Sequence, residues 1–475
     1  MVAQQQELAP TPPEVKHSVG VSLEEVLQAG LRMEASAYSV EGRNAVAELK
    51  ACGYPLKALY GEGAFCDWAY NAFRFPRVWV GKDRGIELLS SSDIIETTPE
   101  SGKYLSIKKT KRLEELKVQL WDILISCSGT IGNVGLASKA FTNKTVSQHV
   151  IRVRAPKPEI AGFLAAFLRG RYGRLQMGLS TYGSVVQHIE PHHLESLLVP
   201  DFGETTVHDI GHKMLQVYRW RDEANRLLAE ADDLLHERLK LPRLKEPKAK
   251  GPSIAKTKLN KLNFRFEATY HSAQAIAAER NLARCGHSLL PMADRSIARE
   301  IRAITKFRKR LYVPSGGIPM LSSKQLFQID PIDVKRLAKG AHVKDLPEIS
   351  LEENMLIVTR SGTIGRVHII PKYMDTWTAS EDAIRILANN KEQAGYLYAY
   401  LASDYGQHLI KRLSYGSVVV HIDKDMLGNV LVPVANTEDE AEIGSLVLKA
   451  NTLRDQAWQL ERECISGIEN KIRPN

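Results

Sequence analysis

Clusters of basic side chains are the first candidates for chemistry in this 475-residue sequence. Arginines and lysines gather between Arg299 and Arg310, and a similar cluster stands earlier in the chain. Such groups neutralise nucleic-acid phosphates and release their counterions, although a solvated surface that binds nothing would show the same composition. The basic residues expected to contact DNA are Arg74, Arg77, Lys82, Arg84, Lys108, Lys109, Lys111, Arg112, Lys306, Arg308, Lys309, Arg310, Lys324, Lys335 and Arg336.

Two kinds of glycine-containing segment form a second group of candidates. Ser-Gly-Thr-Ile-Gly occurs at 128–132 and at 361–365, and Tyr-Gly-Ser-Val-Val occurs at 182–186 and at 415–419. A glycine beside a hydroxyl lets backbone N–H groups approach a phosphate, and it equally suits a tight turn whose hydroxyl bonds to the chain. The side chains concerned are Ser128, Thr130, Tyr182, Ser184, His188, Arg360, Ser361, Thr363, Tyr415, Ser417 and His421.

These recurrences belong to an internal repeat that spans most of the chain. Ser128 recurs as Ser361, 233 residues later. The same shift aligns 151–153 with 384–386, 199–200 with 432–433, and Arg-Met-Glu-Ala at 32–35 with Arg-Phe-Glu-Ala at 265–268. Around 89–91 the shift becomes 232, which indicates one short insertion near 82–85. We conclude that one module is used twice.

The two copies agree at some loop positions and differ at others. Agreement suits the scaffold and the phosphate contacts, which both copies need. Differences on the same loops suit base contacts, because Arg pairs well with guanine, Asn or Gln with adenine, and an acid with cytosine. The differing positions are Asn133, Gln148, His149 and Gln187 in the first copy and Arg366, Glu381, Asp382 and Val420 in the second. The copies are therefore expected to read different half-sites.

Both copies predict the same mixed α/β order of elements. An amphipathic helix is expected at 22–52 and 258–286, and another helix at 160–170 and 394–403. Short strands are expected at 77–80, 122–126, 150–153, 311–313, 354–358 and 383–386. The Ser-Gly-Thr-Ile-Gly segments should form tight turns between two strands.

Each copy ends in a long proline-free run with apolar residues at alternating steps of three and four. This spacing is typical of helices packed along a shared seam; a surface helix on its own domain is the alternative. The seam positions are Ile210, Met214, Val217, Ala224, Leu228, Leu235, Ile443, Val447, Ala450, Ala457 and Ile468. Arg221, Arg454 and Glu461 interrupt the pattern.

Six segments follow from these patterns. A disordered polar tail is expected at 1–20, a first globular domain at 21–203 and its long helix at 204–241. A linker at 242–257 leads to a second globular domain at 258–436 and its long helix at 437–475.

Composition and missing motifs exclude several classes of protein. No apolar run is long enough for a membrane span. The five cysteines are scattered and form no CxxC pair, so we expect reduced thiols in a cytoplasmic protein. The net charge of +9 permits polyanion binding. Phosphate-loop, dinucleotide, metalloprotease and nucleophile-elbow motifs are absent. His188, His192 and His193 lack the further ligands that a tetrahedral metal site needs, so we expect neither a metal site nor catalysis.

The combined features resemble the specificity subunits of type I restriction–modification systems, from residue 31 to about residue 472. The resemblance lies in the Arg-Met-Glu-Ala and Arg-Phe-Glu-Ala openings, the Ser-Gly-Thr-Ile-Gly turns, the Tyr-Gly-Ser-Val-Val loops, the Val-Pro ends and the helix after each. It implies two target recognition domains that each bind half of a split double-stranded DNA site. Their long helices would pair as an antiparallel coiled coil with pseudo-two-fold symmetry.

The resemblance also implies partners in a bacterial or archaeal cytoplasm. Two methyltransferase subunits carrying S-adenosylmethionine would dock on this chain, which itself would bind no cofactor. Restriction subunits using ATP and Mg would join in some systems, and related phage-defence systems use similar subunits without that nuclease. Two other readings of the sequence stay open, namely a non-specific or architectural DNA-binding protein and a nuclease or methyltransferase with an unrecognised active site.

Overall fold

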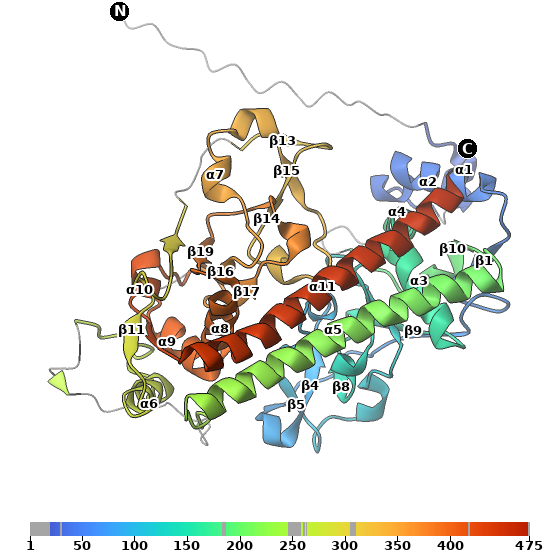
Figure 1. The fold of residues 1–475 in the computed structure, drawn as a ribbon. Helices are drawn as coiled ribbons and strands as arrows, with labels where there is room; N and C mark the ends of the chain where they lie inside the picture. Colours follow the sequence, from blue (N-terminus) through green and yellow to red (C-terminus); the bar gives the residue numbers. More distant parts are fainter. Residues whose placement is uncertain are drawn as a thin grey trace, which may run out of the picture.

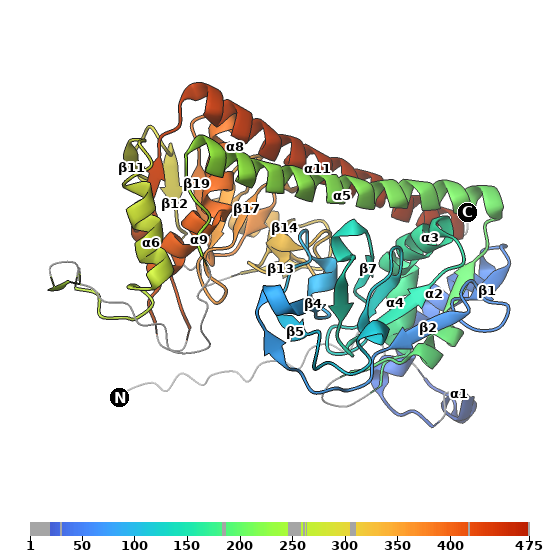
Figure 2. The same cartoon turned by 90° about the horizontal axis from the view of Figure 1, so that it is seen from below.

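The computed structural model describes residues 20–28, 31–182, 187–245, 258–259, 262, 264–304, 310–416 and 419–473. Most of the expected tail and most of the expected linker lie outside these ranges. Within them the chain has the mixed α/β class expected from the sequence. Two long helices, α5 (Glu204–Arg238) and α11 (Thr437–Ile472), lie side by side (Figure 1). Both globular modules lie on the same side of this helix pair (Figure 2).

Each module contains the same three small sheets. In the first module the strand order is β2 (Trp68–Asn71), β9 (Val150–Arg154), β6 (Ile123–Ser126) and β7 (Val134–Leu136). In the second module it is β12 (Glu300–Arg302), β19 (Ala383–Leu387), β16 (Leu356–Thr359) and β17 (Val367–Ile369). The repeat in the sequence is therefore a repeat of topology.

The other two sheets correspond in the same way. One contains β3 (Trp79–Val80), β5 (Tyr104–Ser106), β4 (Gly85–Leu89) and β8 (Lys144–Val146), and its counterpart contains β13 (Tyr312–Val313), β15 (Lys335–Leu337), β14 (Ile318–Leu321) and β18 (Thr378–Ala379). The last is a pair, β1 (Leu56–Ala58) with β10 (Leu198–Pro200), or β11 (Leu289–Pro291) with β20 (Leu431–Pro433). These pairs bring the Val-Pro end of each module back to its start.

The helical stretch expected at the start of each copy contains helices, but it is not continuous. The first copy forms α1 (Leu23–Gln28) and α2 (Val40–Ala51), and the second forms α6 (Ala273–Leu282). The later helices begin at serine caps, where Ser39 accepts a hydrogen bond from Gly42 N and Ser272 accepts one from Ala275 N. A serine that satisfies a free N–H group favours a new helix start over a continuing helix. The smaller helices α7 (Leu346–Ile349) and α10 (Lys424–Gly428) belong to the second module.

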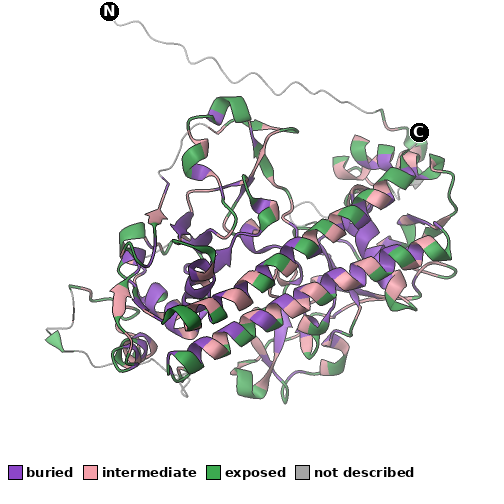
Figure 3. Ribbon diagram, viewed as in Figure 1, coloured by how far each residue is buried: buried purple, intermediate pink, exposed green. Residues whose placement is uncertain are grey.

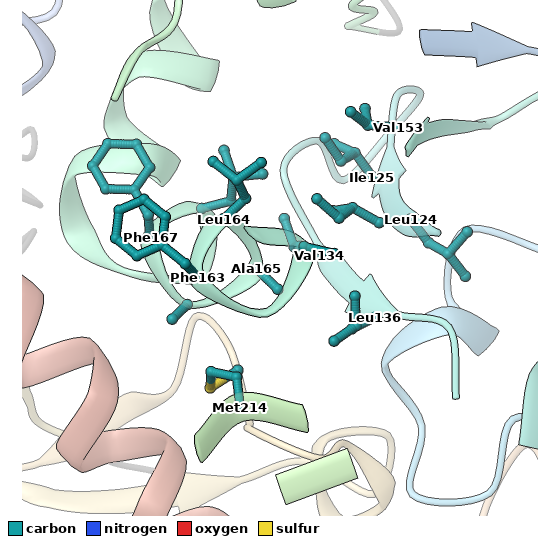
Figure 4. Packing of buried hydrophobic residues seen from close by; sticks show 14 of the residues in the cluster. Leu124, Ile125, Val134, Leu136, Val153, Phe163, Leu164, Ala165, Phe167 and Met214 are labelled. Atoms are coloured by element: carbon teal, nitrogen blue, oxygen red, sulfur yellow. The ribbon is translucent and has the colours of Figure 1, made fainter. Parts of the chain in front are cut away.

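Helices α3 (Pro158–Arg169) and α8 (Lys391–Ala402) form the centre of the two cores. Phe163 and Phe167 of α3 pack with strand residues such as Ile125 and with Met214 of α5 (Figure 4). A second helix follows each of them directly, α4 (Arg171–Leu179) and α9 (Asp404–Arg412), which the sequence patterns did not predict. Each core is thus built between one sheet and one long helix.

Glycines allow the short helices to cross the long ones at backbone contact. A Cβ atom on Gly162 of α3 would lie 2.5 Å from the carbonyl oxygen of Gly211, and one on Gly211 would lie 2.0 Å from that of Glu159. In the second module a Cβ on Gly395 would lie 2.4 Å from the carbonyl oxygen of Gly444. Any larger residue would push the helices apart.

Helices α5 and α11 run in opposite directions. Arg238, at the end of α5, pairs with Glu442 near the start of α11 at 2.7 Å. Lys213, near the start of α5, lies 3.9 Å from Glu463 near the end of α11. Figure 3 shows the buried positions as stripes along both helices. The first half of each helix therefore lies beside the second half of the other.

The apolar positions of these helices are used in three ways. Met214 packs into the core of its own module, and Ala224 packs against Ala450 between the helices. Leu235 of α5 enters the core of the second module, and Ile468 of α11 enters the core of the first. Each long helix consequently contributes side chains to the cores of both modules, in addition to packing against the other long helix.

A buried ionic cluster interrupts the apolar packing. Glu461 of α11 is fully buried and lies 2.7 Å from Arg221 of α5 and 2.7 Å from Arg169 of α3. Burial alone would raise the pKa of Glu461, but the two arginines outweigh it and lower the pKa to about 2. The carboxylate therefore stays ionised and joins the first module to the distant end of the chain.

The modules also touch each other directly. Ile329 N donates to Ile95 O at 2.8 Å, and Thr97 N donates to Phe327 O at 2.8 Å. Between these bonds Glu96 faces Gln328, its own counterpart in the second copy. Corresponding residues thus meet at this contact.

None of the described helices is long and apolar enough to cross a membrane.

The glycine crossing predicts the effect of one added methyl group. Gly211→Ala should lower the free energy of unfolding by on the order of 3 kcal/mol, since its Cβ would overlap a backbone oxygen. Gly178→Ala in α4 is the control, because no atom lies within 4 Å of that site, and it should be neutral or stabilise by up to about 1 kcal/mol. Chemical denaturation of both variants checks this, and equal midpoints would contradict it.

The buried carboxylate predicts a second stability change. Glu461→Leu installs the residue found at the corresponding position 228, removes the nearest carboxylate from two buried arginines and should cost roughly 3–5 kcal/mol. Glu463→Leu, whose side chain is exposed, should cost less than about 1 kcal/mol.

The same carboxylate predicts a pH dependence. Because its folded pKa of about 2 is below the ordinary value of 4.5, its contribution is present above pH 4.5 and is lost as the pH falls toward 2. The difference in unfolding free energy between the wild type and Glu461→Leu should therefore shrink over that range. A constant difference down to pH 3 would contradict the assignment.

Candidate nucleic-acid interface

The Ser-Gly-Thr-Ile-Gly segments are tight turns between strands, as predicted. The first joins β6 to β7 and the second joins β16 to β17. Gly129 and Gly132 have φ angles of 76° and 79°, in the left-handed region that favours glycine. Ser126 Oγ accepts from Asn133 N at 2.9 Å and donates to Thr130 O at 2.6 Å. Thr359 closes the second turn with the same two bonds, so both turns are fixed internally.

Three segments far apart in the sequence meet at each turn. Ser128 Oγ lies 2.6 Å from His188 Nδ1, and Gly129 N donates to Gln187 O at 3.2 Å. Cys127 N donates to His149 O at 3.0 Å. The turn therefore holds both the 147–149 segment and the two residues, Gln187 and His188, that follow the Tyr-Gly-Ser-Val-Val segment.

The second module repeats this arrangement. Ser361 Oγ lies 2.8 Å from His421 Nδ1, Gly362 N donates to Val420 O at 3.2 Å, and Arg360 N donates to Asp382 O at 2.9 Å. Tyr182 and Tyr415 each exchange two backbone hydrogen bonds with the histidine of their own loop. Ser184 and Ser417 lie outside the described residues.

The arginine that opens each module anchors this region. Arg32 Nη1 donates to Leu179 O at 3.0 Å, and its other terminal nitrogen donates to Thr181 O, directly before the loop tyrosine. Tyr38 Oη donates in turn to Arg32 O at 2.6 Å. In the second module Arg265 donates to Ser414 O at 2.9 Å, and His271 Nε2 donates to Arg265 O at 2.7 Å. The Arg-Met-Glu-Ala and Arg-Phe-Glu-Ala segments thus hold the loops.

Two grooves lie between the modules, and each is lined by both. The first groove has a volume of about 600 Å³ and the second about 390 Å³. The first is lined mostly by the first module, and the second module adds Thr363 and Arg366. In the second groove the roles are exchanged, and the first module adds Thr130 and Asn133. The turn of each module therefore reaches the groove of the other.

An arginine and an aromatic ring stand at corresponding places in the two grooves. Trp79 and Tyr312 remain 42% and 40% exposed, although large aromatic side chains are usually buried. The sequence patterns did not single them out, although an aromatic residue at the same place in both copies would have indicated them. Exposed rings can contact base edges or sugars.

The two arginines have different partners. Arg77 Nη2 donates to the neutral amide Gln148 Oε1 at 2.9 Å, whereas Arg310 is paired with the carboxylate of Glu381. Burial and the charge of Arg77 lower the pKa of His149, which keeps that ring neutral near neutral pH. The first groove therefore presents an arginine beside amide and imidazole groups, and the second presents an arginine–carboxylate pair.

Most of the predicted phosphate-contacting residues are exposed, but some have partners. The exposed ones include Arg74, Lys82, Lys108, Lys109, Lys111, Lys324, Lys335 and Arg336. Arg84 lies 3.3 Å from Asp83, and Arg112 pairs with Glu115 and covers the Phe73 ring at 4.3 Å. Lys306, Arg308 and Lys309 lie outside the described residues.

Two of the residues predicted to contact bases are not freely exposed to solvent. Asn133 is nearly buried. Arg366 donates to both oxygens of Glu96 in the first module, at 3.2 and 2.7 Å. Among the described residues no group of three or more His, Cys, Asp or Glu side chains could hold a metal ion.

Residues 300–449 match the family model described as the type I restriction modification DNA specificity domain. That range covers most of the second module and the start of α11, and the first module repeats its sequence pattern and strand order. No curated protein sequence matches the chain.

Among solved structures, the chain is similar to two S subunits. One is the S subunit of a type I restriction-modification system from M. genitalium, with 14% identity and a TM-score of 0.30 over 89% of this chain and 96% of that chain. The other is the HsdS subunit from Thermoanaerobacter tengcongensis, with 14% identity and a TM-score of 0.27 over 88% and 95% of the two chains.

The anchoring arginine predicts a local effect. Arg32→Ala removes two charge-assisted hydrogen bonds, together worth about 2 kcal/mol or more, so the amides of Tyr182 and His188 should exchange with solvent roughly tenfold or more faster. Arg43→Ala removes a partly exposed ion pair with Glu25 and should leave those amides unchanged. Hydrogen–deuterium exchange measures both, and equal protection in the two variants would contradict the anchor.

Proposed function

We propose, because residues 300–449 match the type I restriction modification DNA specificity domain and the first module repeats the same sequence pattern and strand order, that the chain reads a two-part DNA target and positions methyltransferases there. The globular modules are its target recognition domains, and α5 and α11 form an antiparallel coiled coil against which both modules pack, with pseudo-two-fold symmetry. The chain contributes recognition and no catalysis.

The spacing of the modules supports a two-part target. The first module crosses α5 at Gly211, and the second crosses α11 at Gly444, two residues after Glu442, which pairs with Arg238. The crossings are therefore roughly 25 residues apart along the rod, which is about 37 Å. Recognition units one DNA turn apart are separated by about 34 Å. Two modules held in this way suit half-sites on one face of the duplex.

The chemistry of the grooves supports an asymmetric target. The observation that carries the proposal is the arginine with different partners at the same place, Gln148 beside Arg77 and Glu381 beside Arg310. Arginine with a neutral amide suits a guanine beside an adenine, whereas a carboxylate can accept from the amino group of cytosine. Exposed lysines in the groove linings, Lys103 in the first and Lys324 and Lys335 in the second, supply phosphate contacts.

The partners follow from the family. Methyltransferase subunits supply S-adenosylmethionine and the methyl transfer, and we propose two of them because the modules offer two related surfaces. Restriction subunits that use ATP and Mg join where the system has them, and a methylation-based phage-defence system without that nuclease would use the chain in the same way.

Binding-site selection from a pool of random duplexes, by the full chain with its methyltransferase partner, tests this proposal. It should return a split motif with two different halves and a preference of about a thousandfold or more over random DNA. Affinity that falls steeply with salt and shows no sequence preference would instead establish the architectural alternative. Cleavage or methylation by the chain alone, given Mg and S-adenosylmethionine, would contradict the non-catalytic role.

A further inference from the structure

Each groove is lined in part by side chains of the opposite module. In the first groove Arg366, from the turn of the second module, binds both oxygens of Glu96. The corresponding positions at the second groove are Asn133 and Gln328, two neutral amides. An ion pair in the first groove and two neutral amides in the second groove thus occupy corresponding sequence positions.

The opposite module's residues are firmly held there. The guanidinium of Arg366 lies 3.8 Å from the centre of the Phe327 ring, and two backbone hydrogen bonds join the modules on either side of Glu96. Asp330 adds ionic contacts to Arg169 at 3.7 Å and to Arg174 at 3.6 Å. The groove walls from the two modules therefore cannot move independently.

We infer that each DNA half-site is read by both modules, with the Ser-Gly-Thr-Ile-Gly turn of one completing the reading surface of the other. The inference rests on the proposed function and deepens it. Arg366 is a positioning residue for the half-site of the first module, because it neutralises and orients Glu96 at the groove. Asn133 has the corresponding place in the half-site of the second module.

The charges explain why such a residue changes base preference. The first groove is also lined by Asp93 and Glu100, so without Arg366 the Glu96 carboxylate would add an unpaired negative charge near DNA. Paired, it offers a fixed acceptor whose direction Arg366 sets. The amides at the second groove can both donate and accept, so they present a different pattern to a base pair.

The test exchanges the two pairs while leaving the net charge of each groove unchanged. Glu96→Gln with Arg366→Asn installs at the first groove the amide pair that the second already has. Gln328→Glu with Asn133→Arg is the matched reverse exchange. Half-sites are first assigned with Arg77→Ala in the first groove and Arg310→Ala in the second, by site selection with the full chain and its methyltransferase partner.

The two-module reading predicts which half-site changes. The Glu96/Arg366 exchange should alter preference roughly tenfold or more at one or more bases of the half-site that Arg77→Ala alters. The reverse exchange should act on the other half-site. Affinity for each variant's own selected sequence should stay within about threefold of wild type, because the groove charge is conserved.

Three outcomes separate the inference from the function on which it rests. Altered bases in the half-site assigned to the second module after the Glu96/Arg366 exchange would overturn the inference, because each turn would then serve its own module. Unaltered preference in both exchanges would also overturn it. A wild-type chain without a split motif, or single arginine variants that alter no base, would contradict the proposed function itself.

Discussion

Backbone contact between glycines on crossing helices is the constraint on which the rest of the structure depends. At Gly162 and Gly211, and again at Gly395 and Gly444, a helix of the core lies so close to the long helix that no side chain fits between them. This closeness fixes the sheet next to α3 or α8 and, through the strands, the turns at their ends. The positions of the grooves therefore depend on where these two pairs of helices cross.

The sequence predicted the parts of the structure that both copies share. The turn after β6 could be predicted because its two glycines recur in both copies between apolar runs, whereas the meeting of His149 and His188 at that turn was not predicted. The sequence did not show where the helical stretch at the start of each copy is interrupted, because the amphipathic pattern continues past the serine caps. The crossing glycines were missed because a lone glycine in a helix does not show what packs against it.

Contacts between the modules could not be predicted at all. Glu96 and Arg366 are 270 positions apart, and nothing in the spacing of their neighbours links them. Arg366 was therefore predicted from its loop to contact bases, whereas its guanidinium lies on the carboxylate of the other module. Similarly, Arg221 and Glu461 appeared only as interruptions of an apolar pattern, although they are each other's partners.

The meeting of Glu96 with Gln328 has a consequence for how the duplication diverged. In a dimer of two identical modules this position would place a residue against its own copy. A glutamate there would set one carboxylate against another, whereas two glutamines could share hydrogen bonds. Joining the copies in one polypeptide lets each side of the contact mutate alone, so an acid could arise on one side and an arginine could come to accompany it. Two copies in one polypeptide can therefore differ chemically at this contact, whereas two identical modules in a symmetric dimer could not.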